Sequence, residues 1–378
     1  MKHKVNPFKF GSIVSGKYFY NREEELLRIK QTLAGGNNIT LYAPRRYGKS
    51  SLVKKALNEL KEEGFITVYL DFMSVYSRET FIKNYAKEIA DSQTTSLENT
   101  VKKIAKLISG IVPSVSFDAS GMPTFSLSWV EGKDKEQTLI DIINLPEKLS
   151  NPNKKWIIAF DEFQEVTKLN GDNFEKLLRS CIQNHQNVSY LFLGSKTHLL
   201  QDMFNNKNRA FYNAAAVMGI DKIKKEKSVD YLITRFKYSD ISIDKNTAGH
   251  ILDSVAHIPY YIQFVAHEIW QSLILNGRNQ VTINDIDEAI ETILTLKSDY
   301  YWELTNKQTP YRKKVLYALS KSAEEIFSKR TADKYNLGAV SSTQKALESF
   351  IESGIIERTS NKYESSDPIY NLFVKINL

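Results

Sequence analysis

Two kinds of apolar pattern alternate over about the first 220 residues of the chain. Short continuous apolar runs are typical of strands that are buried on both faces of a sheet. The segments between them carry apolar residues at the 3.6-residue spacing of amphipathic helices. Strands that alternate with helices predict an α/β fold with a parallel, doubly wound sheet. The predicted strands are residues 39–42, 65–70, 156–160, 188–193 and 215–220.

Residues 112–130 show a different pattern, in which apolar and polar residues alternate. Alternation of period two on either side of residues 118–123 predicts a β-hairpin with a longer loop, inserted on the sheet domain. The hairpin is either an exposed ribbon for a partner or an element of internal packing, and the sequence favours neither interpretation.

Strand signals stop at Lys222, and helical periodicity continues to about residue 300. Pro259 suits the first position of one of these helices. The cluster Lys222, Lys224, Lys225 and Lys227 is most simply a solvated, basic hinge. We therefore expect an all-helical lid over residues 222–300, with helices at 228–236, 248–256, 259–275 and 283–294.

Residues 301–378 have the pattern of a winged helix-turn-helix domain. Three helices are predicted before two short strands that flank Ser360 and Asn361. The segment holds 12 Lys and Arg against 9 Asp and Glu. The helix expected to read DNA carries Gln344 as its one good base reader, so we expect weak, salt-sensitive DNA binding or a protein contact. The predicted helices are residues 311–319, 324–335 and 341–353, and the strands are residues 355–358 and 362–364.

The first 20 residues combine lysines, among them Lys2 and Lys4, with several aromatic residues. This combination suggests either nucleic-acid contact or a coil laid over a nucleotide base, and we favour the coil. Asn21 is a predicted N-cap for the helix that follows, whose first turn holds Glu23, Glu24 and Glu25.

Composition sets broad limits. The chain has 378 residues, of which 42% are hydrophobic and 25% charged, a balance typical of a globular protein of several domains. Its net charge of +7 permits an anionic partner without requiring one. The single cysteine, Cys181, excludes an internal disulfide framework and fits a reducing compartment. No apolar run approaches the ~18 residues that span a bilayer, so we expect a cytoplasmic protein with no membrane partner.

The strongest chemical signal follows the first predicted strand. Ala43 and the run Gly48-Lys49-Ser50 have the spacing of a phosphate-binding loop, with alanine in place of the first glycine. Backbone N–H groups at a helix N-terminus attract phosphate, and Gly48 permits close approach. We expect Lys49 to bind the β- and γ-phosphates and Ser50 to bind Mg²⁺. Alanine at position 43 is tolerated if its φ is negative.

A second signal is the acidic pair Asp161 and Glu162, which ends a predicted central strand. Ligands of open α/β sheets bind at the carboxyl ends of the strands. We expect Asp161 to belong to the Mg²⁺ shell and Glu162 to polarise the attacking water, although the pair could instead cap the following helix. Ser195, which ends the next strand, is a candidate for sensing the γ-phosphate or orienting water, or is a simple turn residue.

These motifs resemble a known family. Residues 43–52 (APRRYGKSSL), 157–165 (IIAFDEFQE), 19–23 (FYNRE) and 366–370 (SDPIY) resemble the prokaryotic ATPases, abundant in archaea, that are related to the AAA+ and STAND P-loop ATPases. The resemblance covers nearly the whole chain, and the layout is also similar to archaeal replication initiators. It implies an AAA+-like ATPase core at residues 1–221, a helical lid at 222–300 and a winged helix at 301–378.

The resemblance also implies residue roles. Asn21 and Arg22 would border the adenine, and Pro259 would lie on a lid helix that faces the nucleotide. Ala256 and His257 stand where the family tends to have glycine before that proline. The whole set expected to bind ATP or ADP is Asn21, Arg22, Ala43, Pro44, Arg45, Arg46, Tyr47, Gly48, Lys49, Ser50, Ser51 and Pro259.

Two functional hypotheses follow. The first is a Mg²⁺-dependent ATPase whose nucleotide state controls the lid and the winged helix. The second is a DNA-binding regulator or protein-interaction switch that uses the nucleotide with little turnover. An oligomeric relative would supply an arginine to a neighbour's γ-phosphate, and Arg179 and Arg209 are candidates, although ordinary packing is the simpler role for each.

Overall fold

The computed structural model describes residues 5–93, 97–117, 119–121, 123–169, 171–322, 325–359 and 362–378. Some residues named in the sequence predictions lie outside these ranges: Lys2, Lys4, residues 118 and 122 of the hairpin loop, Glu324, Ser360 and Asn361. Contacts divide the chain into two compact units. The sheet unit is Arg22–Ala43 with Lys49–Asp221, and the helical unit is Met1–Asn21, Pro44–Gly48 and Lys222–Leu378.

The sheet unit is built on five parallel strands, in the order β2-β5-β6-β1-β7. The prediction of a parallel sheet is therefore confirmed. The interior strand β5 is buried at all six positions, which explains its continuous apolar sequence. The strands are β1 (Ile39–Tyr42), β2 (Ile66–Asp71), β5 (Trp156–Asp161), β6 (Val188–Gly194) and β7 (Ala216–Gly219).

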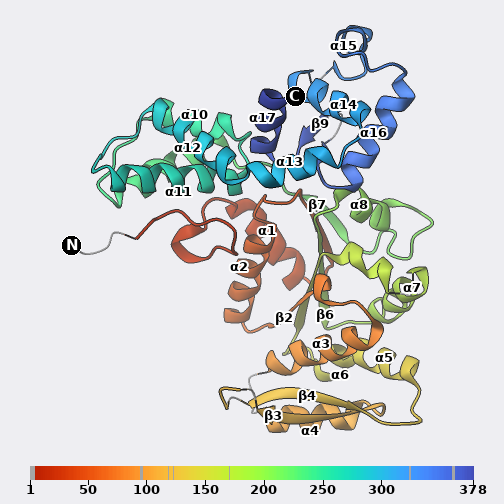
Figure 1. Ribbon diagram of the computed structural model, residues 1–378. Coiled ribbons are helices and arrows are strands. Elements are labelled where there is room, and N and C mark those ends of the chain that lie inside the picture. Colours follow the sequence, from red (N-terminus) through yellow and green to blue (C-terminus); the bar gives the residue numbers. More distant parts are fainter. Residues whose placement is uncertain are drawn as a thin grey trace. The chain divides into compact units, whose positions relative to one another are not determined.

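Helices cover both faces of this sheet (Figure 1). One face is covered by α1 (Glu23–Ala34) and α2 (Lys49–Glu62). The other face packs a large aromatic core, in which the tilted rings of Phe163 and Phe192 lie with their centroids 4.7 Å apart. The helices on that side are α3 (Arg78–Asp91), α5 (Lys135–Ile143), α7 (Gly171–Ile182) and α8 (Thr197–Asn205). Two 3₁₀ turns, η2 (Phe72–Ser74) and η3 (Phe163–Lys168), follow β2 and β5.

The hairpin prediction is confirmed. Strands β3 (Ile111–Phe117) and β4 (Pro123–Trp129) pair antiparallel in a sheet of their own. They pack on α3 and on α4 (Leu97–Leu107), and α6 (Leu145–Leu149) lies beside α4. Hydroxyl groups pair across one side of the hairpin, at Ser114–Ser126 (2.7 Å) and Ser116–Thr124 (2.9 Å).

The helical unit carries the expected run of helices and then a winged helix. The first of these helices are α9 (Lys225–Lys237), α10 (Lys245–Ser254), α11 (Pro259–Leu275) and α12 (Ile283–Leu296). After α13 (Ser298–Asn306) come α14 (Pro310–Ser322), α15 (Lys329–Tyr335), α16 (Val340–Glu352), the antiparallel strands β8 (Ile356–Thr359) and β9 (Lys362–Ser365), and α17 (Pro368–Asn377). The short turn η1 (Gly16–Tyr18) precedes α1 in the chain.

Some local predictions were wrong. The N-cap of α1 is Arg22, not Asn21, and no side chain caps it, because both residues adopt left-handed φ values of 58° and 77°. The helix predicted from residue 324 begins only at Lys329, where Ser328 accepts a hydrogen bond from the Thr331 N–H at 3.1 Å. Helices α8, α13 and α17 were not predicted.

Candidate active site

The register of the parallel strands brings three chemical segments to one edge of the sheet. Asp71 at the end of β2 pairs in register with Asp161 at the end of β5. Tyr42 at the end of β1 pairs with Gly194 at the end of β6. The loop after β1, the acidic pair after β5 and Ser195 after β6 therefore leave the sheet at its carboxyl edge, the usual ligand edge of such folds.

The loop after β1 has the backbone that its sequence predicts. Gly48 has a φ of 81°, which a side chain would disfavour, whereas Ala43 is not among the residues with positive φ. Lys49 begins α2 and is only 6% exposed, and its Nζ donates a hydrogen bond to the Ala43 carbonyl at 3.3 Å. The first turn of α2 offers backbone N–H groups at the positive end of the helix dipole, and this arrangement favours an anion.

Ser50 and Asp161 meet within the sheet unit. The Ser50 hydroxyl donates to Asp161 Oδ2 at 2.9 Å, and the Tyr69 hydroxyl donates to the same oxygen. Burial raises the pKa of Tyr69, and the negative charge of Asp161 raises it further, so Tyr69 stays protonated and remains a donor. Asp161 Oδ1 accepts from the backbone N–H of Glu162 at 2.8 Å.

The side chains of Ser50 and Asp161 would suit Mg²⁺ as oxygen ligands. Mg²⁺ usually takes one or two protein oxygens and completes its shell with water and nucleotide phosphates. In the part of the chain that the structure describes, no group of three or more His, Cys, Asp or Glu side chains could hold a metal ion. A Ser50–Asp161 site needs no such cluster, because phosphate and water supply the remaining ligands.

The side chain of Glu162 is fixed by two neighbours. Its Oε2 accepts hydrogen bonds from the Ser195 hydroxyl at 2.7 Å and from Gln164 Nε2 at 2.5 Å, and Glu162 itself has a left-handed φ of 48°. Burial alone would raise the pKa of Glu162, but the positive charge of Lys49 and the hydrogen bonds from Gln164 and Ser195 outweigh burial and lower it. Glu162 is therefore ionised at neutral pH and able to accept a proton.

Gly194 leaves room for this arrangement. A Cβ at Gly194 would lie 2.2 Å from Gln164 Oε1, closer than any real contact. Gln164 is 2% exposed, and its Oε1 has no hydrogen-bond partner in the structure. The glycine at the end of β6 thus allows the Gln164 amide to lie against Glu162.

The other predicted nucleotide residues are distributed over both units. Arg22 is buried in the sheet unit, where it donates to the Asp221 carbonyl at 2.6 Å and pairs with Glu25 at 2.8 Å. In the helical unit, Pro259 is the first residue of α11, as expected. Of the remaining residues in this set, Pro44, Tyr47 and Ser51 are buried, whereas Arg45 and Arg46 are exposed.

The two arginine candidates differ. Arg209 forms ion pairs with Glu175 at 2.6 Å and with Asp202 at 2.7 Å, and Glu175 is buried. These contacts match the packing role that was the simpler interpretation. Arg179 lies in the last turn of α7 and is half-buried.

Sequence reasoning missed two contributors to the site, Tyr69 and Gln164. Gln164 lies two residues after Glu162, so its nearness in sequence to the acidic pair could have marked it as a candidate site residue. Tyr69 gave no signal, because only the pairing of β2 with β5 brings it to Asp161.

Comparison with known proteins agrees with this geometry. A family profile described as an ATPase domain predominantly from Archaea matches residues 19–265, well over half of the chain. The chain belongs to this family. A second family profile, described as a probable winged helix domain, matches residues 299–376 of the chain. The resemblance inferred from the motifs is therefore confirmed.

Two proteins similar to this chain have low sequence identity to it. An uncharacterised ATP-binding protein of Methanocaldococcus jannaschii is 28% identical over 176 residues, which cover 44% of this chain and 47% of that protein. The match thus spans about half the length of the curated relative. The Walker-type ATPase paby2304 of Pyrococcus abyssi has a similar fold, with a TM-score of 0.67, 19% identity and coverage of 98% of this chain and 99% of that one.

Two further structures share the fold. The ORC2 protein of Aeropyrum pernix has a TM-score of 0.53 at 10% identity, with coverage of 99% of this chain and 98% of that one. The ORC1 protein of the same organism, solved in complex with DNA, has a TM-score of 0.50 at 12% identity, with coverage of 96% and 94%. Within the described residues, no helix is long and apolar enough to cross a membrane.

Proposed function

We propose that this protein binds ATP with Mg²⁺ and hydrolyses it at the carboxyl edge of the sheet. The observation that carries the proposal is the position of Glu162, directly after β5, where Ser195 and Gln164 both donate hydrogen bonds to its Oε2. An ATP-binding protein needs no such carboxylate, whereas hydrolysis needs a group that accepts a proton from water.

Each residue has a role in this reaction. Lys49 and the N–H groups at the start of α2 hold the β- and γ-phosphates and stabilise negative charge as the terminal phosphoryl group departs. Ser50 and Asp161 would hold Mg²⁺, which when bound neutralises phosphate charge and fixes the phosphate geometry. Glu162 orients and polarises the attacking water, and the hydrogen bonds from Ser195 and Gln164 keep its oxygen in place.

The test uses Glu162→Gln, which keeps the shape of the side chain and removes the basic oxygen. We expect turnover to fall by about 10²- to 10⁴-fold while ATP still binds. Glu165→Gln is the matched control, because Glu165 lies on the 3₁₀ turn that follows Glu162 but pairs with Lys168 and Lys196. Turnover in Glu162→Gln equal to that of the unchanged protein would show that Glu162 is not the base. Loss of ATP binding in Lys49→Ala separately tests the phosphate loop.

The winged helix is proposed to contact DNA weakly or to contact a protein. The exposed face of α16 carries Lys345 against Glu348 and Glu352, and Gln344 donates to Glu348 at 3.1 Å. Gln344 is hydrogen-bonded to a carboxylate, and the exposed face of α16 has no excess of positive charge. Both features favour non-specific contact with DNA over recognition of a base sequence. Turnover measured with double-stranded and single-stranded DNA tests this: stimulation that weakens with salt supports DNA, and no response favours a protein partner.

A further inference from the structure

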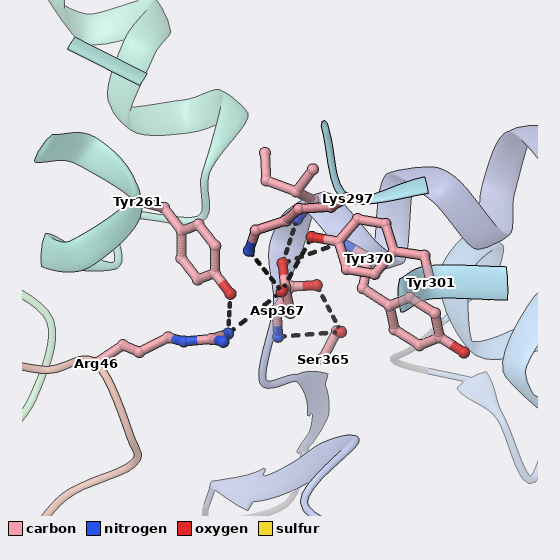
Figure 2. A network of polar contacts seen from close by, with 8 residues as sticks. Arg46, Tyr261, Lys297, Tyr301, Ser365, Asp367 and Tyr370 are labelled. Atoms are coloured by element: carbon pink, nitrogen blue, oxygen red, sulfur yellow. Dashed lines mark hydrogen bonds and ion pairs between the residues drawn. The ribbon is translucent and has the colours of Figure 1, made fainter. Parts of the chain in front are cut away.

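Asp367 of the winged helix uses its two carboxylate oxygens for different purposes. Oδ1 caps α17 by accepting hydrogen bonds from the backbone N–H groups of Ile369 and Tyr370, each at 3.0 Å. Oδ2 lies 3.3 Å from Arg46 Nη1 and 3.7 Å from Lys297 Nζ, and accepts a hydrogen bond from the Tyr301 hydroxyl at 3.1 Å (Figure 2). The capping oxygen and the oxygen that faces the cations are therefore separable by substitution.

Arg46 belongs to the phosphate loop, yet its contacts are made with α11 and with Asp367. Its carbonyl accepts a hydrogen bond from the Tyr260 N–H at 3.3 Å, and its Nη1 donates to the Tyr261 hydroxyl. The guanidinium lies 5.2 Å from the ring centroid of Tyr260 and 5.0 Å from that of Tyr261. Arg46 also has a left-handed φ of 72°, a conformation that persists only where surrounding contacts impose it. All of these residues belong to the helical unit.

The charges in this cluster do not balance. Arg46 and Lys297 bring two positive charges to the single negative charge of Asp367. Lys297 is half-buried between aromatic rings, with the centroids of Phe264 and Tyr301 5.5 Å and 5.6 Å from its Nζ. Burial and the nearby Arg46 lower the pKa of Lys297, which is the effect expected of a cation short of negative partners. A phosphate with more than one negative charge would neutralise these cations better than one carboxylate does.

We propose that the Asp367 carboxylate is a resident substitute for the terminal phosphate of ATP, and that the two compete for Arg46. This inference rests on the proposed nucleotide site, because Arg46 stands only two residues before Gly48 in the phosphate loop. Consecutive Cα atoms are about 3.8 Å apart, so the long Arg46 side chain can reach a phosphate held at Gly48 and Lys49. A triphosphate draws Arg46 from Asp367 and releases the winged helix from the loop, whereas a diphosphate leaves the pair closed.

The test compares Asp367→Asn with the unchanged protein in calorimetric titrations with Mg²⁺ and either ADP or a non-hydrolysable ATP analogue. Asparagine retains the capping oxygen, so α17 keeps its N-terminus, but the negative charge that holds Arg46 is lost. We expect the dissociation constant of the ATP analogue to fall by roughly fivefold or more, and that of ADP to change by less than about twofold. In an Arg46→Gln background, Asp367→Asn should change neither dissociation constant, because the guanidinium for which Asp367 and the phosphate compete is absent.

Asp244→Asn is the matched control. Asp244 caps α10 by accepting from the N–H groups of Asn246 (2.8 Å) and Thr247 (2.9 Å), so the substitution makes the same change of charge at a cap away from Arg46. Equal affinities of Asp367→Asn and the unchanged protein for the ATP analogue would overturn the competition and leave the nucleotide site standing. A shift of the same size in Asp244→Asn, or one that persists without Arg46, would overturn it as well. If the unchanged protein bound neither nucleotide, the proposed function itself would fall, and the competition with it.

Discussion

Gly194→Ala tests whether Gln164 positions the catalytic carboxylate. The added Cβ would lie 2.2 Å from Gln164 Oε1 and 3.2 Å from Leu200 Cδ2. Real contacts of a Cβ almost never fall below 3.0 Å, so the amide must move by nearly 1 Å or more. Gln164 is buried, and this movement breaks its 2.5 Å hydrogen bond to Glu162. The φ of Gly194 is not left-handed, so alanine adds no backbone strain.

The structure sets the expected size of the effect. A hydrogen bond to a charged group contributes about 1.5–3 kcal/mol, and each 1.36 kcal/mol of barrier is tenfold in rate. If the whole contribution is lost from the transition state, kcat falls by roughly 10- to 150-fold. Nucleotide affinity should change by less than about threefold, because Lys49 and Ser50 are not displaced. Crowding in the core also lowers the free energy of unfolding by about 1–3 kcal/mol.

The assay is steady-state ATP hydrolysis at saturating ATP and Mg²⁺, with a thermal melt to confirm folding. Gly219→Ala is the matched control, since Gly219 ends β7 and its added Cβ would lie no closer than 3.1 Å to Tyr42. In a Gln164→Ala background, Gly194→Ala should cost little further activity, because the obstructing amide is gone. A folded Gly194→Ala protein with undiminished kcat would refute the positioning role of Gln164.

Two further predictions concern pH and stability. Ser195→Ala removes a hydrogen bond that lowers the pKa of Glu162, so the acid limb of the kcat/KM profile should move to higher pH, and an unchanged limb would contradict this. In the unchanged protein the pKa of Glu162 is lowered from its ordinary value of 4.5, so its stabilising contribution is present above that pH and is lost as pH falls further. Ala256→Gly should raise the free energy of unfolding in urea by about 0.5–1 kcal/mol, because Ala256 has a φ of 53° that costs alanine more than glycine. Ala332→Gly, inside α15, should instead lower it by about 1 kcal/mol, and a loss in both variants would argue against strain at Ala256.

The sequence alone determined the elements that depend on local pattern. The apolar strand before Ala43, the strand that ends at Asp161, and the hairpin of the winged domain all appear close to their predicted residues, as do the first and third helices of that domain. Such elements follow from periodicity and from loop residues such as Gly48, whose positive φ only glycine adopts easily. Helix α17 also has local start signals in the sequence, since Asp367 caps it and Pro368 is its first residue.

The partners of the functional side chains were decided by tertiary structure. Ser50 meets Asp161 across 111 positions of sequence, and Arg46 meets Asp367 across 321. Tyr69 reaches Asp161 only because β2 lies next to β5 in the sheet order. Local periodicity fixes which residues of a strand are buried, but not which strand is its neighbour. The neighbours of each strand are determined by the packing of the whole sheet, and the contacts of Arg46 by the packing of the helical unit. In both, contacts between residues distant in sequence offset the entropic cost of closing long loops.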